Sequence, residues 1–220
     1  MTMTPDFELA ATAALRTLLF HNITAAPIVP LPIVKSTPGV LAMPFAELAY
    51  NVGMERNKLV PLFSENQDAV TFHVGGDKVK YVVAYNQYLP FDAIRRGLAR
   101  ELGHIVLGHD GATRPADVRL AEAMCFARHL LFPRPLIHAI QEAGFPLTVD
   151  VVGSITGCYE RCLVGLRTTP GVHVDPDLNR AVKDRFSDFI QNFVDFQTLV
   201  SPGDSTAPAD FGTFMDGYEE

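Results

Sequence analysis

Hydrophobic positions recur with two different periods along the chain, and they predict a helical protein with one β-rich stretch. Apolar residues at three- and four-residue spacing predict a series of helices. These are expected over 6–20, 44–50, 91–108, 115–132, 134–143, 148–166 and 175–199. A Pro-punctuated stretch over 22–32 predicts an extended connector, because a residue before Pro avoids the helical region.

The β-rich stretch lies between the second and third of these helices. Residues 69–74 and 79–85 are rich in β-branched and aromatic side chains, and a Gly-Gly-Asp-Lys segment separates them. This arrangement predicts a β-hairpin. Residues 39–41 predict one further short strand.

The helix predicted over 91–108 contains the residues of greatest chemical interest. Glu101 and His104 are three positions apart, so they project from nearly the same face. This pair is part of the H-E-x-x-H pattern, in which two His bind zinc and the Glu deprotonates the attacking water. Where that pattern has its first His, this chain has Arg100, which keeps its proton and cannot bind a cation.

Composition narrows the class of protein. Of 220 residues, 48% are hydrophobic and 20% charged, which is typical of a globular domain. The net charge of −7 argues against direct nucleic-acid binding and against an anionic membrane surface. No apolar run reaches the roughly 18 residues that a membrane span needs. Three Cys without a C-x-x-C pair, and no secretion signal, predict a cytoplasmic protein.

The change of composition near the C-terminus predicts the domain organisation. Residues 1–200 are expected to form a single domain, with the central motifs over 84–133 and further helices over 134–200. From residue 201 onward Pro, Gly, Ser, Thr and acidic residues dominate, and the last twenty residues contain no Lys or Arg. Residues 201–220 are therefore expected to be an acidic flexible tail.

The order of motifs resembles that of one known family. The hairpin ends in Ala84-Tyr85-Asn86, and Arg100-Glu101-Leu102-Gly103-His104 follows in the next helix. The subsequent helix contains Glu122-Ala123, Phe126-Ala127 and Leu130-Leu131-Phe132-Pro133. Together these resemble the ImmA/IrrE family of zinc metallopeptidase-like proteins, common in phages and mobile elements. The resemblance implies an α+β, helix-rich, zincin-like fold with a small β-sheet beside the active-site helix, and an activity that cuts regulatory proteins, typically repressors.

The resemblance also implies roles for single residues. Glu101 matches the general base, and His104 matches the second metal-binding His. The third ligand of the family is an acidic residue, and counting back from Pro133 places Leu120 there. Glu122, two residues further on, remains a possible metal ligand if the register of this helix differs. His109 lies about 140° from the face of His104 on a continued helix, so it is expected to be a helix-end residue.

Three hypotheses for function follow. In the first, the chain is a catalytically degenerate relative that has no cofactor. It binds a regulatory protein or peptide. Arg100 then occupies the place of the metal and pairs with Glu101 or Glu122 within hydrogen-bonding distance. In the second, it is an active zinc endopeptidase with altered metal ligation that cleaves a repressor-type protein. In the third, it is a non-catalytic interaction module that acts through the acidic tail.

Overall fold

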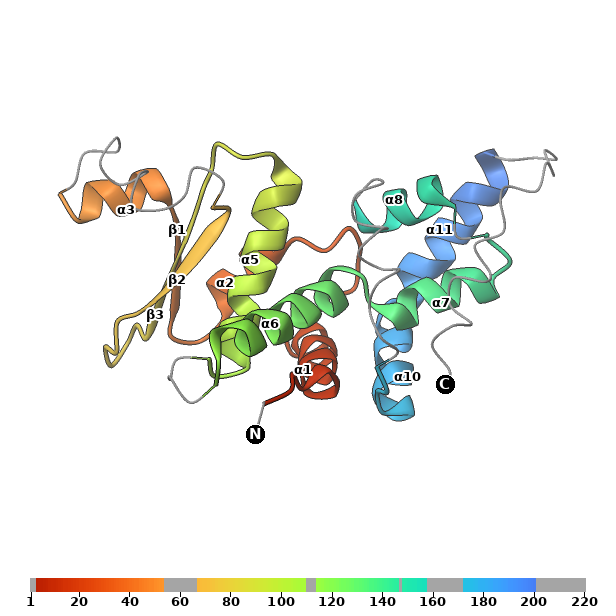
Figure 1. Cartoon of the computed structure of the whole chain (residues 1–220). Helices are drawn as coiled ribbons and strands as arrows, with labels where there is room; N and C mark the ends of the chain where they lie inside the picture. Colours follow the sequence, from red (N-terminus) through yellow and green to blue (C-terminus); the bar gives the residue numbers. More distant parts are fainter. Residues whose placement is uncertain (1–2, 54–66, 110–113, 147, 158–171, 201–220) are drawn as a thin grey trace. The chain divides into compact units, whose positions relative to one another are not determined.

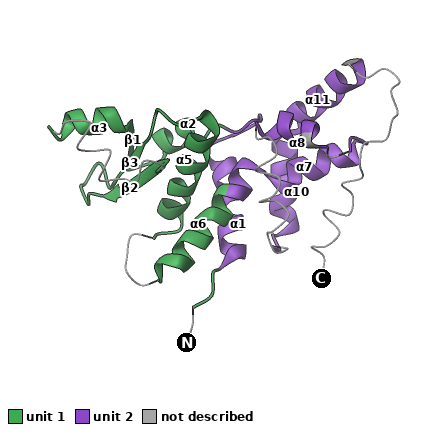
Figure 2. Ribbon diagram, turned by 45° about the horizontal axis from the view of Figure 1, so that its top comes forward, with its two compact units in different colours: residues 1–5, 29–127 green, residues 6–28, 128–220 purple. Residues whose placement is uncertain are grey.

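The structure is a computed structural model that describes residues 3–53, 67–109, 114–146, 148–157 and 172–200. The predicted tail over 201–220 lies outside the described residues. The chain divides into two compact units, which Figure 2 shows in green and purple. Unit 1 comprises residues 1–5 and 29–127, and unit 2 comprises residues 6–28 and 128–220. A single domain over 1–200 stays a prediction.

Unit 1 contains a three-stranded mixed sheet. Its strands are β1 (Val40–Pro44), β2 (Ala69–His73) and β3 (Tyr81–Tyr85), in the order β1-β3-β2. β2 and β3 are antiparallel, which confirms the predicted hairpin. β1 pairs with β3 in parallel, so a distant segment of the chain enlarges the hairpin to a sheet.

Helices pack on this sheet. In α3 (Phe45–Asn51), Phe45 and Ala49 form a buried cluster with Ala84 of β3. α5 (Phe91–Val106), which carries Arg100, Glu101 and His104, contacts β2 and β3 (Figure 1). A helix-rich α+β fold with a small sheet beside the candidate active-site helix is thus confirmed. Its zincin-like character stays a prediction.

Two further helices complete unit 1. α2 (Pro30–Ser36) contacts β1 and α5, so the prediction of an extended connector is wrong from residue 30 onward. Pro30 and Pro32 lie in the first turn, where a helix needs no N–H donor and tolerates Pro. α6 (Ala116–Leu131) follows α5, and the boundary between the two units falls after Ala127 within it.

Unit 2 consists of helices in the part of it that the structure describes. These are α1 (Phe7–Phe20), α7 (Arg134–Glu142), α8 (Val149–Thr156), α10 (Pro176–Arg185) and α11 (Ser187–Val200), together with the last turn of α6. α10 contacts both α1 and α7, and Val182 and Phe186 are buried there. None of the described helices is long and apolar enough to cross a membrane.

Two helix boundaries in unit 2 differ from the predictions. The helix predicted over 148–166 begins as expected, with Thr148 accepting a hydrogen bond from the Val151 amide, but α8 ends at Thr156. Gly157 adopts a φ of 66°, which ends a helix in the left-handed region. Residues 158–166 of that prediction lie outside the described residues. The last helix is interrupted at Phe186 rather than continuous over 175–199.

Candidate functional site

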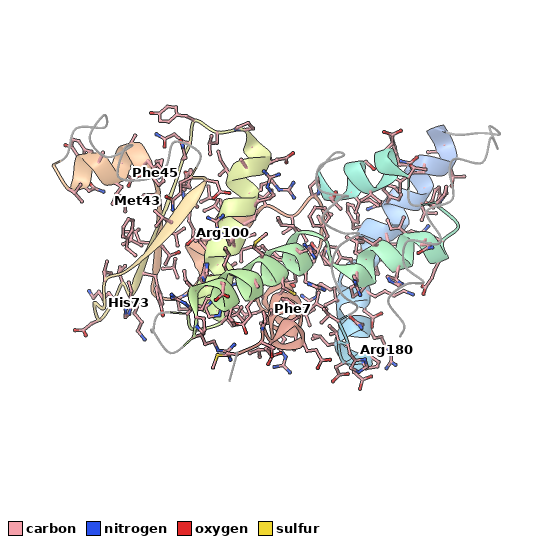
Figure 3. All side chains as sticks on the ribbon, in the orientation of Figure 1. Phe7, Met43, Phe45, His73, Arg100 and Arg180 are labelled. Carbon is pink, nitrogen blue, oxygen red and sulfur yellow. The ribbon has the colours of Figure 1, made fainter. Side chains whose placement is uncertain are left out.

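Arg100 forms ion pairs with two carboxylates at the interface between α5 and β2. Its Nη2 lies 2.8 Å from Glu101 Oε1 and 2.8 Å from Asp68 Oδ1, and its Nε lies 3.1 Å from Glu101 Oε1. The same Nη2 donates to the carbonyl of Ala69 at 3.1 Å. Figure 3 labels Arg100 on α5. The expected contact between Arg100 and Glu101 is therefore present, and Arg100 has a second carboxylate partner in Asp68.

Asp68 can reach Arg100 because α5 has a glycine at the point of closest approach. A Cβ on Gly97 would lie 2.8 Å from Asp68 Cγ and 2.9 Å from its Cβ. Real Cβ atoms do not approach so closely, so any larger residue at this position would displace Asp68. Gly97 thus helps to determine the charge partner of Arg100, one turn further along α5.

A second polar chain links His104, His109 and Glu122. His104 Nδ1 lies 3.0 Å from His109 Nδ1, and His109 Nε2 lies 3.0 Å from Glu122 Oε2. Arg114 donates to the other carboxylate oxygen, Oε1. The side chains of His109 and Glu122 are each 2% exposed, so the contact between them is buried, whereas His104 and Arg114 are partly exposed. Both oxygens of Glu122 have partners, and its carboxylate is paired with Arg114 rather than with Arg100.

His109 follows the end of α5 as expected, but the prediction that it lies away from His104 is wrong. α5 ends at Val106, and Gly108 follows with a φ of 66°. The His109 amide donates to the His104 carbonyl, and the Gly108 amide donates to the Ile105 carbonyl, which is the Schellman arrangement. Because the left-handed glycine reverses the chain, His109 returns to the side of His104. The prediction assumed that the helix continues past residue 106, and it therefore placed His109 on the wrong side.

The orientation of α6 places Glu122 rather than Leu120 at the site. Glu122 is 1% exposed, whereas Leu120 is 45% exposed. The two positions are separated by about 200° on a helix, so they cannot both face inward. Glu122 is therefore the acidic side chain that α6 brings to His109, and its role as a metal ligand stays a prediction.

The two polar clusters adjoin a cavity of about 370 Å³ within unit 1. Its walls include Glu101, His104 and Ile105 from α5, His109, and residues of β2 such as Thr71. His73, labelled at the end of β2 in Figure 3, also contributes to the wall. The candidate base Glu101 and the candidate metal-binding His104 therefore line the same small cavity beside β2.

Burial and neighbouring charges change the ionisation of this site. Burial lowers the pKa of His104 to about 4, and His109, Arg100 and Arg119 contribute in the same direction. Burial also lowers the pKa of His109, although Glu122 opposes the effect. Burial raises the pKa of Glu101 despite the opposing effect of Arg100. For Arg100, burial acts to lower the pKa, but Glu101 and Asp68 outweigh it and raise the pKa.

These shifts indicate a defined proton arrangement at neutral pH. With both imidazoles neutral, His109 donates from Nε2 to Glu122 and accepts at Nδ1 from His104. His104 then has its lone pair on Nε2. That is the form of a metal-binding His whose other nitrogen donates to a supporting group.

Acid is expected to destabilise the chain through His104. In the unfolded chain this imidazole takes a proton near pH 6.5, whereas in the folded chain it does so only near pH 4. The unfolded state therefore binds more protons between these values, and stability falls as the pH is lowered from 6.5 to 4. The melting temperature of the metal-free protein should fall across this interval, and less steeply in the His104→Gln variant. Equal slopes in the two proteins would contradict the assignment.

The donor set differs from that of a catalytic zinc site. Such a site uses three protein ligands and an open position for water. Here Arg100 stands in place of the first His, and both oxygens of Glu122 are engaged by His109 and Arg114. Within the described ranges, no group of three or more His, Cys, Asp or Glu side chains is arranged to hold a metal ion. The residues present therefore do not fit a catalytic zinc.

Sequence reasoning identified Arg100, Glu101, His104 and Glu122, and the structure adds Asp68, Arg114 and His109. Asp68 is 32 residues from Arg100 in the sequence, and only the packing of α5 on β2 brings them together. Arg114 precedes α6 in a segment without a periodic pattern. The position of His109 could have been predicted from the preceding Gly108, because a glycine after a helix favours the chain reversal that the structure shows.

Comparison with known proteins identifies the region that contains the site. The chain has no significant match among curated proteins or among solved structures. Residues 60–151, however, match the family model of the IrrE N-terminal-like domain. This range includes β2, β3, α5 and α6, and with them every residue of the two polar clusters. Residues 60–151 are thus an IrrE N-terminal-like domain of the ImmA/IrrE family of metallopeptidase-like proteins.

Proposed function

We propose that this chain is a catalytically degenerate metallopeptidase-like protein, acting without a metal cofactor, that binds a regulatory protein or peptide. The ion pair between Arg100 and Glu101 is the observation that carries the proposal. A general base must accept a proton from water, but Glu101 Oε1 already accepts two N–H groups of Arg100. The cation thus neutralises the carboxylate that a metal site would use for catalysis.

Features of the same cavity support binding. Val70 and Ile105 provide apolar surface beside Tyr81 and three imidazoles, and such a mixture is typical of sites that hold a ligand side chain. The cavity adjoins β2, where an extended segment could lie along a strand. The family supports a regulatory protein as the partner class and a phage or mobile element as the context.

A peptide-display selection on the full chain tests this proposal with two matched variants. Ile105→Lys places a charge in the cavity wall, whereas Val106→Lys changes the adjacent residue, which is 41% exposed and outside the wall. Peptides enriched on the unmodified chain should lose binding to Ile105→Lys and keep it to Val106→Lys. Equal binding to both variants would contradict the proposal. If removal of residues 201–220 abolishes binding instead, the acidic tail is the interaction site.

One observation favours a second candidate, an active zinc endopeptidase with altered ligation. The contact of His104 Nδ1 with His109 leaves His104 in the tautomer that binds metals through Nε2. Elemental analysis and incubation of the zinc-supplemented protein with a peptide mixture separate the two candidates. We expect far less than one zinc per chain and no cleavage. Stoichiometric zinc, with cleavage that disappears in Glu101→Gln, would favour the endopeptidase.

A further inference from the structure

Unit 2 contains a cavity that plays no part in the site described above. Its volume is about 440 Å³, within the range of small-molecule sites. Its walls come from α1, α7, α10 and the segment over 172–174, which are all parts of unit 2. Figure 3 labels Arg180, which lies on α10 at this cavity.

The charge of this cavity is opposite to that of the whole chain. Among the described residues of its wall are three cations, Arg134, Arg180 and Lys183, and one carboxylate, that of Glu142. Three cations against one anion give a formal surplus of two positive charges, in a chain of net charge −7. His129 and His138 add further polar nitrogens, and His129 is only 3% exposed. Such a cluster attracts a multiply charged anion.

The ion pairs that these cations already make are weak competitors for an anion. Lys183 Nζ lies 2.5 Å from Glu142 Oε2, and Arg180 Nη1 lies 3.1 Å from Asp177 Oδ1. The paired side chains are between 48% and 83% exposed. Exposed pairs contribute about 0–1 kcal/mol, so both cations can turn to a ligand at little cost.

Apart from Asn179, the remaining described residues of the cavity wall are apolar. They are Leu15 of α1, Pro135 and Ala139 of α7, and Val172 and Val174. A ligand of matching chemistry therefore has an apolar body and a compact anionic group. A phosphate monoester has this form, since its headgroup carries about two negative charges at neutral pH and several acceptor oxygens.

We infer that the cavity formed by α1, α7 and α10 binds a small phosphate monoester with an apolar body. Arg180 and Lys183 hold the phosphate, and Leu15, Pro135 and Val174 contact the apolar body. This inference does not depend on the proposed function, because the two cavities share no residue.

Calorimetric titration of the full chain with phenyl phosphate tests the inference. Saturable binding with a Kd below about 1 mM is expected, and Arg180→Ala and Lys183→Ala should each weaken it about tenfold, the loss of one charge-assisted contact. Arg185→Ala is the matched control, because Arg185 is an exposed cation of the same helix outside the cavity wall. It should leave the Kd within about twofold. Unchanged circular dichroism establishes that each variant is folded.

Two further probes test the chemistry of the ligand. Benzoate has the same ring with a single charge, and inorganic phosphate has the charge without the ring, so each should bind more weakly than phenyl phosphate. Absence of saturable phenyl phosphate binding overturns the inference, as does an unchanged Kd in Lys183→Ala. An equal loss of affinity in Arg185→Ala would show general charge attraction instead of a site. Benzoate binding as tightly as phenyl phosphate would overturn the choice of a dianion.

Discussion

Replacing Arg100 by Met is expected to lower the free energy of unfolding by about 3 kcal/mol. The side chains of Glu101 and Asp68 are only 8% and 19% exposed, and Arg100 is the cation that both contact. Without it, two carboxylates face each other in a poorly hydrated place. Breaking a buried pair costs about 3–5 kcal/mol, and we take the lower end because Arg100 is 23% exposed. The melting temperature should fall by about 6–12 °C in a chain of this size.

A matched variant and a double mutant identify the cause of this loss. Arg96→Met removes an exposed cation of the same helix, and it should change stability by no more than about 0.5 kcal/mol. Adding Glu101→Gln to Arg100→Met removes one of the orphaned charges, so it should restore part of the lost stability. If Arg100→Met is no more destabilising than Arg96→Met, Arg100 and Glu101 are merely solvated residues of α5.

Local patterns predicted most elements because the periods of helices and strands can be recognised within short stretches. The hairpin and α5 depend on neighbours in sequence, so their residues alone indicated them. The parallel pairing of β1 with β3 joins segments about 40 residues apart, and no local pattern specifies such a partner. The break at Phe186 was also missed, because an apolar stripe continues on both sides of it.

The candidate site shows the same division between local and long-range information. Arg100 and Glu101 are neighbours in one helix, and their contact could be anticipated from the sequence. The choice between Leu120 and Glu122 depended on which face of α6 is buried, which a count from Pro133 could not decide. Asp68 and Arg114 reach the site through packing alone, and these residues supply the additional charges that balance it.

Restoring the missing His is expected to give the chain a zinc site. In Arg100→His, a neutral imidazole replaces the cation one turn before His104, and the repulsion between guanidinium and metal disappears. His104 already has the tautomer that binds through Nε2, and Glu122 can supply a carboxylate if zinc displaces its contact with Arg114. Zinc content should rise from far below one to about one per chain, measured by elemental mass spectrometry after exhaustive dialysis.

The comparison with Arg100→Gln separates the effect of adding a His ligand from the effect of removing the cation. Glutamine also removes the cation, but its amide is a poor zinc ligand, so this variant should gain no stoichiometric zinc. Zinc in both variants would mean that repulsion by Arg100 alone had kept the metal out, and that the remaining donors suffice. Zinc in the unmodified chain would overturn the view of Arg100 as the occupant of the metal position. A folded Arg100→His variant that fails to bind zinc would show that Glu122 cannot serve as a ligand. In that case Arg114 and His109 hold its carboxylate too firmly. That carboxylate is the acidic donor that α6 brings to the site.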